Sequence, residues 1–64
     1  MKLLVDNANA KEIKRIFEYY PMDGVTTNPS LLKNEGRAPY DVLREIRNLI
    51  GVDRELHVQV IAQS

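Results

Sequence analysis

The chain has 64 residues, of which 44% are hydrophobic, and its nine basic and nine acidic residues give a formal net charge of zero. This length allows one small domain with a marginal core, and the balanced charge argues against a nucleic-acid-binding protein, whose surface carries a basic excess. The chain has no cysteine and a single histidine, which excludes disulfide bonds and argues against a zinc site. Since no apolar run reaches the length of a membrane span and no signal peptide is recognisable, we expect a cytoplasmic protein without a membrane partner.

A strand and a helix are predicted first. Residues 2–6 form a short, nearly continuous apolar run, which is typical of a strand covered on both faces. Asn9 stands three residues before Glu12, a spacing that suits a helix N-cap, and Pro21 ends the helix. Between these limits, apolar side chains recur at helical spacing and predict one buried stripe, made of Ile13, Ile16, Phe17 and Tyr20.

The next predicted elements are a second strand and a short turn. Residues 25–27 favour a strand, which is entered through a glycine. Pro29 holds Asn28 extended, and we expect it to keep the chain from running directly into a helix. Ser30 is then the predicted cap of a short turn that contains residues 31–32.

A longer helix and a third strand complete the pattern. Pro39 suits the first turn of a helix, and Gly51 suits the position just after its end. The apolar stripe between them consists of Val42, Leu43, Ile46, Leu49 and Ile50. Residues 56–61 are predicted to form a strand. The order β-α-β-α-β indicates an α/β fold with parallel strands and right-handed crossovers. The open sheet edges, and the lack of a stop signal in residues 62–64, are typical of the first part of a longer domain.

Polar side chains gather where the three predicted strands end. Because side chains alternate across a strand, Asp6 lies at the end of the first strand, and Thr26 and Asn28 share a face of the second. His57 and Gln59 share the polar face of the third strand, whose apolar face should meet the helices. These polar side chains are therefore expected to lie together, and in a barrel of parallel strands such positions are catalytic or substrate-binding.

Each of these residues also has a purely structural interpretation. Asp6 could cap the loop that follows it, Asn28 could belong to a turn with a helix cap, and Thr26 is an ordinary β former. Gln59 is harder to explain in this way, because a buried amide needs hydrogen-bond partners. His57 is interpreted as hydrogen-bonded scaffold, because it lies next to a strand start.

Three segments resemble the transaldolase family, in particular its short fructose-6-phosphate aldolase-like branch. Residues 3–9 (LLVDNAN) resemble the first strand of that family, residues 24–30 (GVTTNPS) resemble its second strand and signature turn, and residues 57–60 (HVQV) resemble its third strand. The resemblance implies that residues 1–64 form the first three strands and two helices of a (β/α)₈ TIM barrel, an incomplete domain. It also implies a class I aldolase, which joins a lysine to a ketose carbonyl as a Schiff base and uses no cofactor or metal.

The resemblance further implies a role for four of the polar residues. Asp6 matches the proton-transfer carboxylate beside the Schiff-base lysine. Thr26 and Asn28 match positions near the bound dihydroxyacetone unit of a sugar or sugar phosphate substrate, and Gln59 matches the residue that places a water. An amide orients water but is no carboxylate base, so Gln59 favours the aldolase branch, and a transaldolase of the pentose phosphate pathway stays the alternative.

The lysine nucleophile is missing from this pattern. By resemblance it lies on a fourth strand, whereas the chain offers only Lys2, Lys11, Lys14 and Lys33, none in a desolvated inward setting. We therefore expect an inactive N-terminal fragment of an enzyme, and the resemblance implies that the complete enzyme forms homo-oligomers. The rival hypothesis is a non-enzymatic α/β module that self-associates through its open sheet edges.

Overall fold

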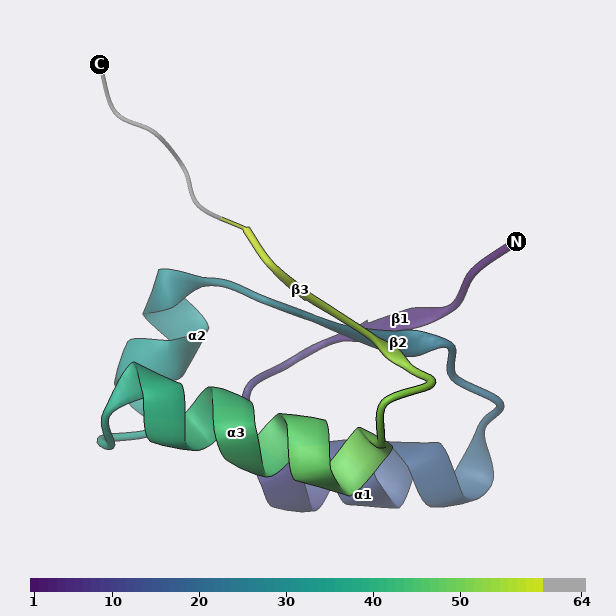
Figure 1. The fold of residues 1–64 in the computed structure, drawn as a ribbon, viewed down its shortest axis with the longest axis horizontal. Helices are drawn as coiled ribbons and strands as arrows, with labels where there is room; N and C mark the ends of the chain where they lie inside the picture. Colours follow the sequence, from purple (N-terminus) through teal and green to yellow (C-terminus); the bar gives the residue numbers. More distant parts are fainter. Residues whose placement is uncertain (60–64) are drawn as a thin grey trace.

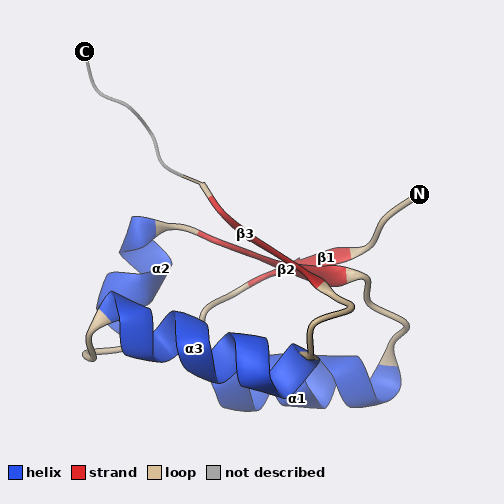
Figure 2. Cartoon of the chain, in the orientation of Figure 1, coloured by secondary structure: helices blue, strands red, loops and turns tan. Residues whose placement is uncertain are grey.

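A computed structural model describes residues 1–59 of the chain (Figures 1 and 2). In chain order, its elements are β1 (Leu4–Asp6), α1 (Ala10–Tyr19), β2 (Gly24–Thr27), α2 (Pro29–Asn34), α3 (Pro39–Ile50) and β3 (Glu55–Val58). The prediction of an α/β fold with three parallel strands is confirmed, and the arrangement is that of the first β/α units of a TIM barrel. The last part of the predicted third strand, residues 60–61, lies outside the described residues.

The strands form one parallel sheet in the order β1-β2-β3. Helices α1 and α3 lie side by side beneath it in the view of Figure 1, and α2 continues from the far end of β2. Within residues 1–59, no helix covers the opposite face of the sheet (Figure 2). We call the first face the covered face and the second the open face.

Helix α1 begins as predicted and ends slightly earlier. The Asn9 side chain accepts a hydrogen bond from the Glu12 backbone N–H at 3.0 Å, which satisfies one free donor of the first turn. Tyr20, predicted as part of the buried stripe, is instead the C-cap residue and is exposed. Its backbone is extended, because the following Pro21 disfavours the helical conformation for the residue before it.

Helix α2 corrects two expectations about the turn after β2. Pro29 occupies the first turn of a six-residue helix instead of preventing one, because a proline at this position has its φ preset and its missing N–H costs nothing. The cap is Asn28, whose Oδ1 accepts from the Leu31 N–H at 2.9 Å, and not Ser30. The described chain therefore contains three helices, one more than expected.

Helix α3 agrees with its predicted limits. Pro39 lies in its first turn, and Gly51 follows its end with φ of 82°, a left-handed conformation that glycine adopts without a Cβ penalty. The Arg47 guanidinium donates to the carbonyl oxygens of Gly51 at 3.0 Å and of Arg54 at 2.7 Å, which ties the end of α3 to the start of β3.

The hydrophobic core lies between the covered face and the helices. Its buried apolar side chains are Ala8, Ile13, Val25, Leu32, Val42, Ile46 and Ile50. Val25 on the central strand is fully buried, whereas Val5 and Leu56 on the outer strands are only partly buried. The core is therefore one-sided, and its apolar packing leaves the open face free for polar side chains.

Candidate functional site

The register of the sheet places two predicted site residues, Asp6 and Thr26, in one row with His57. Asp6 pairs with Thr26, and Thr26 pairs with His57. Their neighbours in the preceding row, Val5, Val25 and Leu56, belong to the core side. Because side chains alternate along a strand, the row of Asp6, Thr26 and His57 lies on the open face.

Asn28 and Gln59 extend this row toward the carboxyl ends of the strands. The Gln59 N–H donates to the Thr27 carbonyl at 2.9 Å, so the parallel pairing of β2 and β3 continues past Val58 and sets Gln59 beside Asn28. Both residues share the open face, two positions after Thr26 and His57. Gln59 is exposed among the described residues, so the expectation of a buried amide in need of partners is wrong for this part of the chain.

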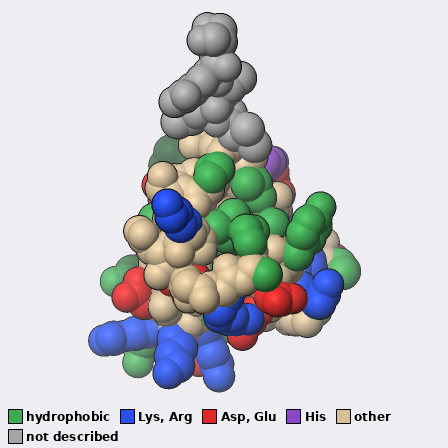
Figure 3. Space-filling view, turned by 90° about the vertical axis from the view of Figure 1, so that its left-hand side faces the viewer, with side chains coloured by type: hydrophobic (Ala, Val, Ile, Leu, Met, Phe, Trp, Pro, Cys, Tyr) green, Lys and Arg blue, Asp and Glu red, His purple; other side chains and the backbone are tan. Residues whose placement is uncertain are grey.

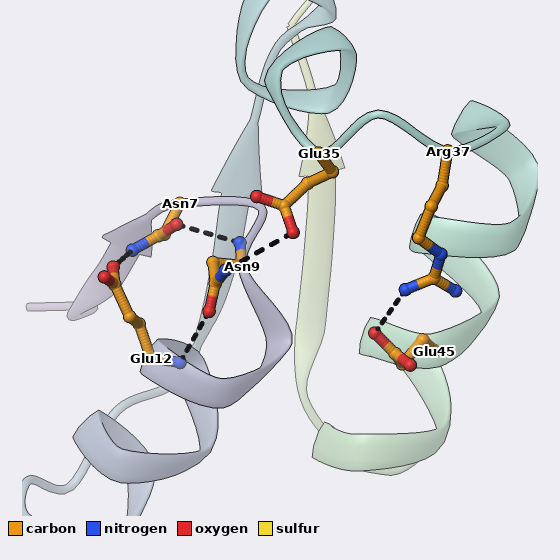
Figure 4. Close-up of polar contacts among 6 residues, drawn as sticks. All are labelled: Asn7, Asn9, Glu12, Glu35, Arg37 and Glu45. Atoms are coloured by element: carbon orange, nitrogen blue, oxygen red, sulfur yellow. Dashed lines mark hydrogen bonds and ion pairs between the residues drawn. The ribbon is translucent and has the colours of Figure 1, made fainter.

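The loop after β1 is held by a neighbour of Asp6. Asn7 Oδ1 accepts from the backbone N–H groups of Ala8 and Asn9 at 2.8 and 2.9 Å, while its Nδ2 donates to Glu12 at 2.7 Å (Figure 4). The interpretation of Asp6 as the cap of this loop is therefore wrong. Within residues 1–59, the Asp6 carboxylate makes no hydrogen bond, so the described structure gives it no structural task.

A second contact joins the two loops that border the candidate site. Asn9 Nδ2 donates to Glu35 Oε1 at 3.4 Å and connects the start of α1 to the end of α2 (Figure 4). Farther along the chain, Arg37 in the connection between α2 and α3 pairs with Glu45 of α3 at 3.0 Å (Figure 4). Sequence reasoning missed these contacts, because Asn9 and Glu35 are distant in the chain and neither pair belongs to a recognisable motif.

Asn28 has a structural task and one spare hydrogen-bonding group. Its Oδ1 is engaged as the cap of α2, which agrees with the structural interpretation of this residue. Among the described residues its Nδ2 makes no hydrogen bond, and an amide nitrogen offers two donors. The side chain can therefore cap the helix and still donate to a ligand on the open face.

A charged network at the amino-terminal end of the open face was also not predicted. Lys2 Nζ contacts Glu55 Oε2 at 2.6 Å, and His57 Nε2 lies 2.9 Å from Glu55 Oε1. The hydrogen bond to Lys2, followed by the one to His57, lowers the pKa of Glu55. The same hydrogen bond, reinforced by Coulombic attraction to Glu55, raises the pKa of Lys2. A Schiff-base nucleophile needs a lowered pKa, so Lys2 is unsuited to that role.

Gly24 allows strands β2 and β3 to lie close together beside this charged network. It lies between Leu4 and Glu55 in the register, and a Cβ added to it would lie 2.2 Å from the Glu55 carbonyl oxygen. Glycine therefore allows β2 and β3 to approach where any side chain would collide. The remaining lysines, Lys11, Lys14 and Lys33, are exposed on the helices and away from the open face.

The connection between α2 and α3 forms a hollow of about 490 Å³ on the outside of the structure. Its lining consists of Pro29, Leu32, Lys33, Gly36, Arg37, Ala38 and Pro39. Figure 3 shows the end of the molecule that carries α2, with apolar side chains gathered over its middle and Lys and Arg side chains mostly below. The lining includes none of the predicted site residues, so this hollow and the open face are separate features.

Two further features bear on the class of protein. In the described part of the chain, no group of three or more His, Cys, Asp or Glu side chains is placed to hold a metal ion. No helix within residues 1–59 is both long and apolar enough to cross a membrane.

Comparisons with known proteins agree with the resemblance seen in the sequence. The family model described as Transaldolase/Fructose-6-phosphate aldolase matches residues 3–64. A probable transaldolase of Thermodesulfovibrio yellowstonii is 50% identical over 50 residues, which are 78% of this chain and 23% of that protein. A probable fructose-6-phosphate aldolase of Streptococcus pneumoniae is 41% identical over 98% of this chain and 29% of its own length. A probable transaldolase of Methanococcus maripaludis is 47% identical over 97% of this chain and 28% of its own length. The chain thus spans less than a third of these relatives.

Proposed function

Because the chain belongs to the transaldolase/fructose-6-phosphate aldolase family, we propose that its open face is one side of the active site of a Schiff-base aldolase. The complete enzyme would cleave or form the carbon–carbon bond between a dihydroxyacetone unit and an aldehyde. The observation that carries this proposal is the row of Asp6, Thr26 and His57 on the open face, with Asn28 and Gln59 beyond it. Polar side chains at the carboxyl ends of parallel barrel strands are the usual site of catalysis in such folds.

Each proposed role uses a chemical property of the side chain. The Asp6 carboxylate, which makes no hydrogen bond among residues 1–59, accepts and returns a proton near the Schiff base. The spare Nδ2 of Asn28 donates to a hydroxyl of the dihydroxyacetone unit, and Thr26 supports the same unit from the adjacent position. The Gln59 amide orients a water for proton transfer.

The nucleophile must come from another part of the protein, because no lysine of this chain lies at the carboxyl end of the open face. We propose that the complete protein supplies this lysine and that residues 1–64 alone are inactive. The test is borohydride reduction in the presence of dihydroxyacetone or fructose 6-phosphate, followed by mass spectrometry. The complete protein should be labelled and the 64-residue chain should not. Stable labelling of Lys2, Lys11, Lys14 or Lys33 would refute the proposal.

Transaldolase activity is the alternative, and Gln59 bears on the choice. An aldolase releases free dihydroxyacetone from its ketose substrate, whereas a transaldolase keeps the unit on the lysine until an acceptor aldehyde arrives. Since Gln59 is an amide and not a titratable carboxylate, we propose the aldolase reaction. Measuring free dihydroxyacetone without an acceptor separates the two. No release without an acceptor, but transfer with one, would favour transaldolase.

We also propose how the complete protein assembles and where in the cell it works. In the described part of the chain, β1 and β3 each pair with a neighbour on one side only, so both need further strands. We propose that the rest of the barrel supplies these strands and that the complete enzyme works in the cytoplasm as a homo-oligomer. Light scattering of the complete protein tests the oligomer. A cooperative, self-associating fold of the 64-residue chain alone would instead favour the non-enzymatic module.

A further inference from the structure

The third member of the polar row, His57, has no role in the function proposed above. It lies in register with Thr26 and, through it, with Asp6, and its side chain is 54% exposed on the open face. His57 Nε2 contacts the Glu55 carboxylate at 2.9 Å, and that carboxylate contacts Lys2 at 2.6 Å. His57 thus lies in the polar row and contacts a carboxylate, an arrangement that packing alone does not explain.

The contact with Glu55 determines where the proton on His57 resides. An ionised carboxylate only accepts hydrogen bonds, and its pairing with Lys2 keeps Glu55 ionised. Nε2 must therefore carry the hydrogen, and in the neutral ring Nδ1 is an acceptor. Within residues 1–59, Nδ1 makes no hydrogen bond. The contact with Glu55 thus orients the ring through Nε2 and leaves Nδ1 available to accept a hydrogen bond from a ligand.

We propose that His57 is a substrate-binding residue, whose Nδ1 accepts a hydrogen bond from a hydroxyl of the ketose, and that Glu55 and Lys2 orient its ring and fix its tautomer. The inference rests on the proposed function, because it needs a polyhydroxylated ligand on the open face. It assigns Glu55 and Lys2 as positioning residues that act through His57. Gly24 belongs to the same arrangement, since its missing side chain leaves room for β3 to approach β2.

Kinetics of His57 variants in the complete protein test this inference. His57→Phe keeps a flat ring but removes both nitrogens, and we expect KM for the ketose to rise roughly five- to tenfold with kcat little changed. His57→Gln offers an amide oxygen in place of Nδ1 and should restore most of the lost affinity. A His57→Phe variant that turns over with unchanged KM would overturn the inference and leave the proposed function intact.

The wild-type protein provides a second readout that no misfolded variant can obscure. Because His57 is the single histidine of this segment, its imidazole resonances can be assigned with selectively labelled histidine and the His57→Gln variant. Dihydroxyacetone should shift these resonances together with the backbone amides of Thr26 and Asn28. Shifts of the amides alone would refute the role of His57. If neither set moves, the proposed function fails, and the inference fails with it.

Kinetics of Glu55 variants in the complete protein test its positioning role. Glu55→Gln keeps an oxygen that can accept from His57 Nε2 and should leave KM for the ketose close to the wild-type value, whereas Glu55→Leu removes the acceptor and should raise KM as His57→Phe does, with kcat little changed. An unchanged KM in Glu55→Leu would contradict the assignment of Glu55.

Discussion

The covered and open faces of the sheet are built from the same three strands but differ in what their side chains do. On the covered face, Val25 and Thr27 are fully buried. On the open face, Asp6, Thr26 and His57 form a row in which Asp6 and His57 are exposed and Thr26 is half-buried. The comparison shows that the buried apolar packing of this chain lies on one face. The polar residues on the open face do not belong to this core, so their side chains are available for binding or catalysis.

Adjacent threonines on β2 show the same contrast on a small scale. Thr27 is fully buried, and its hydroxyl has no hydrogen-bond partner within residues 1–59. Thr26 lies one residue earlier, half-buried on the open face. A one-residue shift along a strand exchanges the two faces, so the position in the register, and not the residue type, separates a core residue from a candidate site residue.

We expect the largest loss of stability from a substitution of Gly24, because the approach of β2 and β3 at this residue shapes both faces of the sheet. Gly24→Ala would place a methyl group 2.2 Å from the Glu55 carbonyl oxygen, so β2 and β3 must separate. We expect a loss of several kcal/mol in the free energy of unfolding, on the order of an overpacked core. Gly36→Ala is the control, because no heavy atom lies within 4 Å of its added Cβ and only its positive φ of 69° disfavours alanine, at a cost of roughly 1–2 kcal/mol. Equal effects in urea unfolding would contradict this explanation.

Asn28 allows the structural and the proposed binding roles to be separated. Asn28→Ala removes the cap of α2 and should cost about 1 kcal/mol, together with ligand affinity. Asn28→Asp keeps the cap oxygen but removes the Nδ2 donor, so it should unfold like the wild type and yet bind the ketose more weakly. Unfolding by urea and KM in the complete protein are the two measurements. Wild-type KM in Asn28→Asp would show that Asn28 serves the helix alone.

The threonine pair offers a more subtle test of the same comparison. Thr27→Val removes a buried hydroxyl without a partner, so stability should stay level or rise by up to about 1 kcal/mol, with KM unchanged. Thr26→Val should leave stability within about 0.5 kcal/mol and raise KM. If Thr27→Val is the variant that raises KM, the assignment of the two faces is wrong.

The smallest expected effect is the pH dependence of the Lys2–Glu55 pair. The pKa of Glu55 is lowered in the folded chain, so its contribution to stability is present at neutral pH and is lost as pH falls through that lowered pKa. The pKa of Lys2 is raised, so its contribution is lost as pH rises through the raised value. Glu55→Gln should therefore differ most from the wild type near neutral pH. A difference that persists below the carboxyl range would refute this, as measured by urea unfolding across pH.

The sequence predicted the covered face better than the open one, for physical reasons. Apolar side chains at helical spacing, such as Ile13 and Ile46, have few alternatives to burial, and their placement follows from periodicity alone. The cap of α2 was predicted at Ser30, two positions beyond the observed cap Asn28, because both residue types are good N-caps and Pro29 suits the start of the helix. The pairing of Lys2 with Glu55 depends on a register between distant strands, which no local pattern encodes.

The central claim is that the substrate lies on the open face. A crystal structure of the complete protein, after borohydride reduction with dihydroxyacetone, tests it most directly. The reduced adduct should lie over Asp6, Thr26, Asn28 and Gln59, with its hydroxyl groups within hydrogen-bond distance of Asn28 Nδ2. An adduct whose contacts come from other strands alone, with Asp6 and Asn28 facing only protein atoms, would contradict the account.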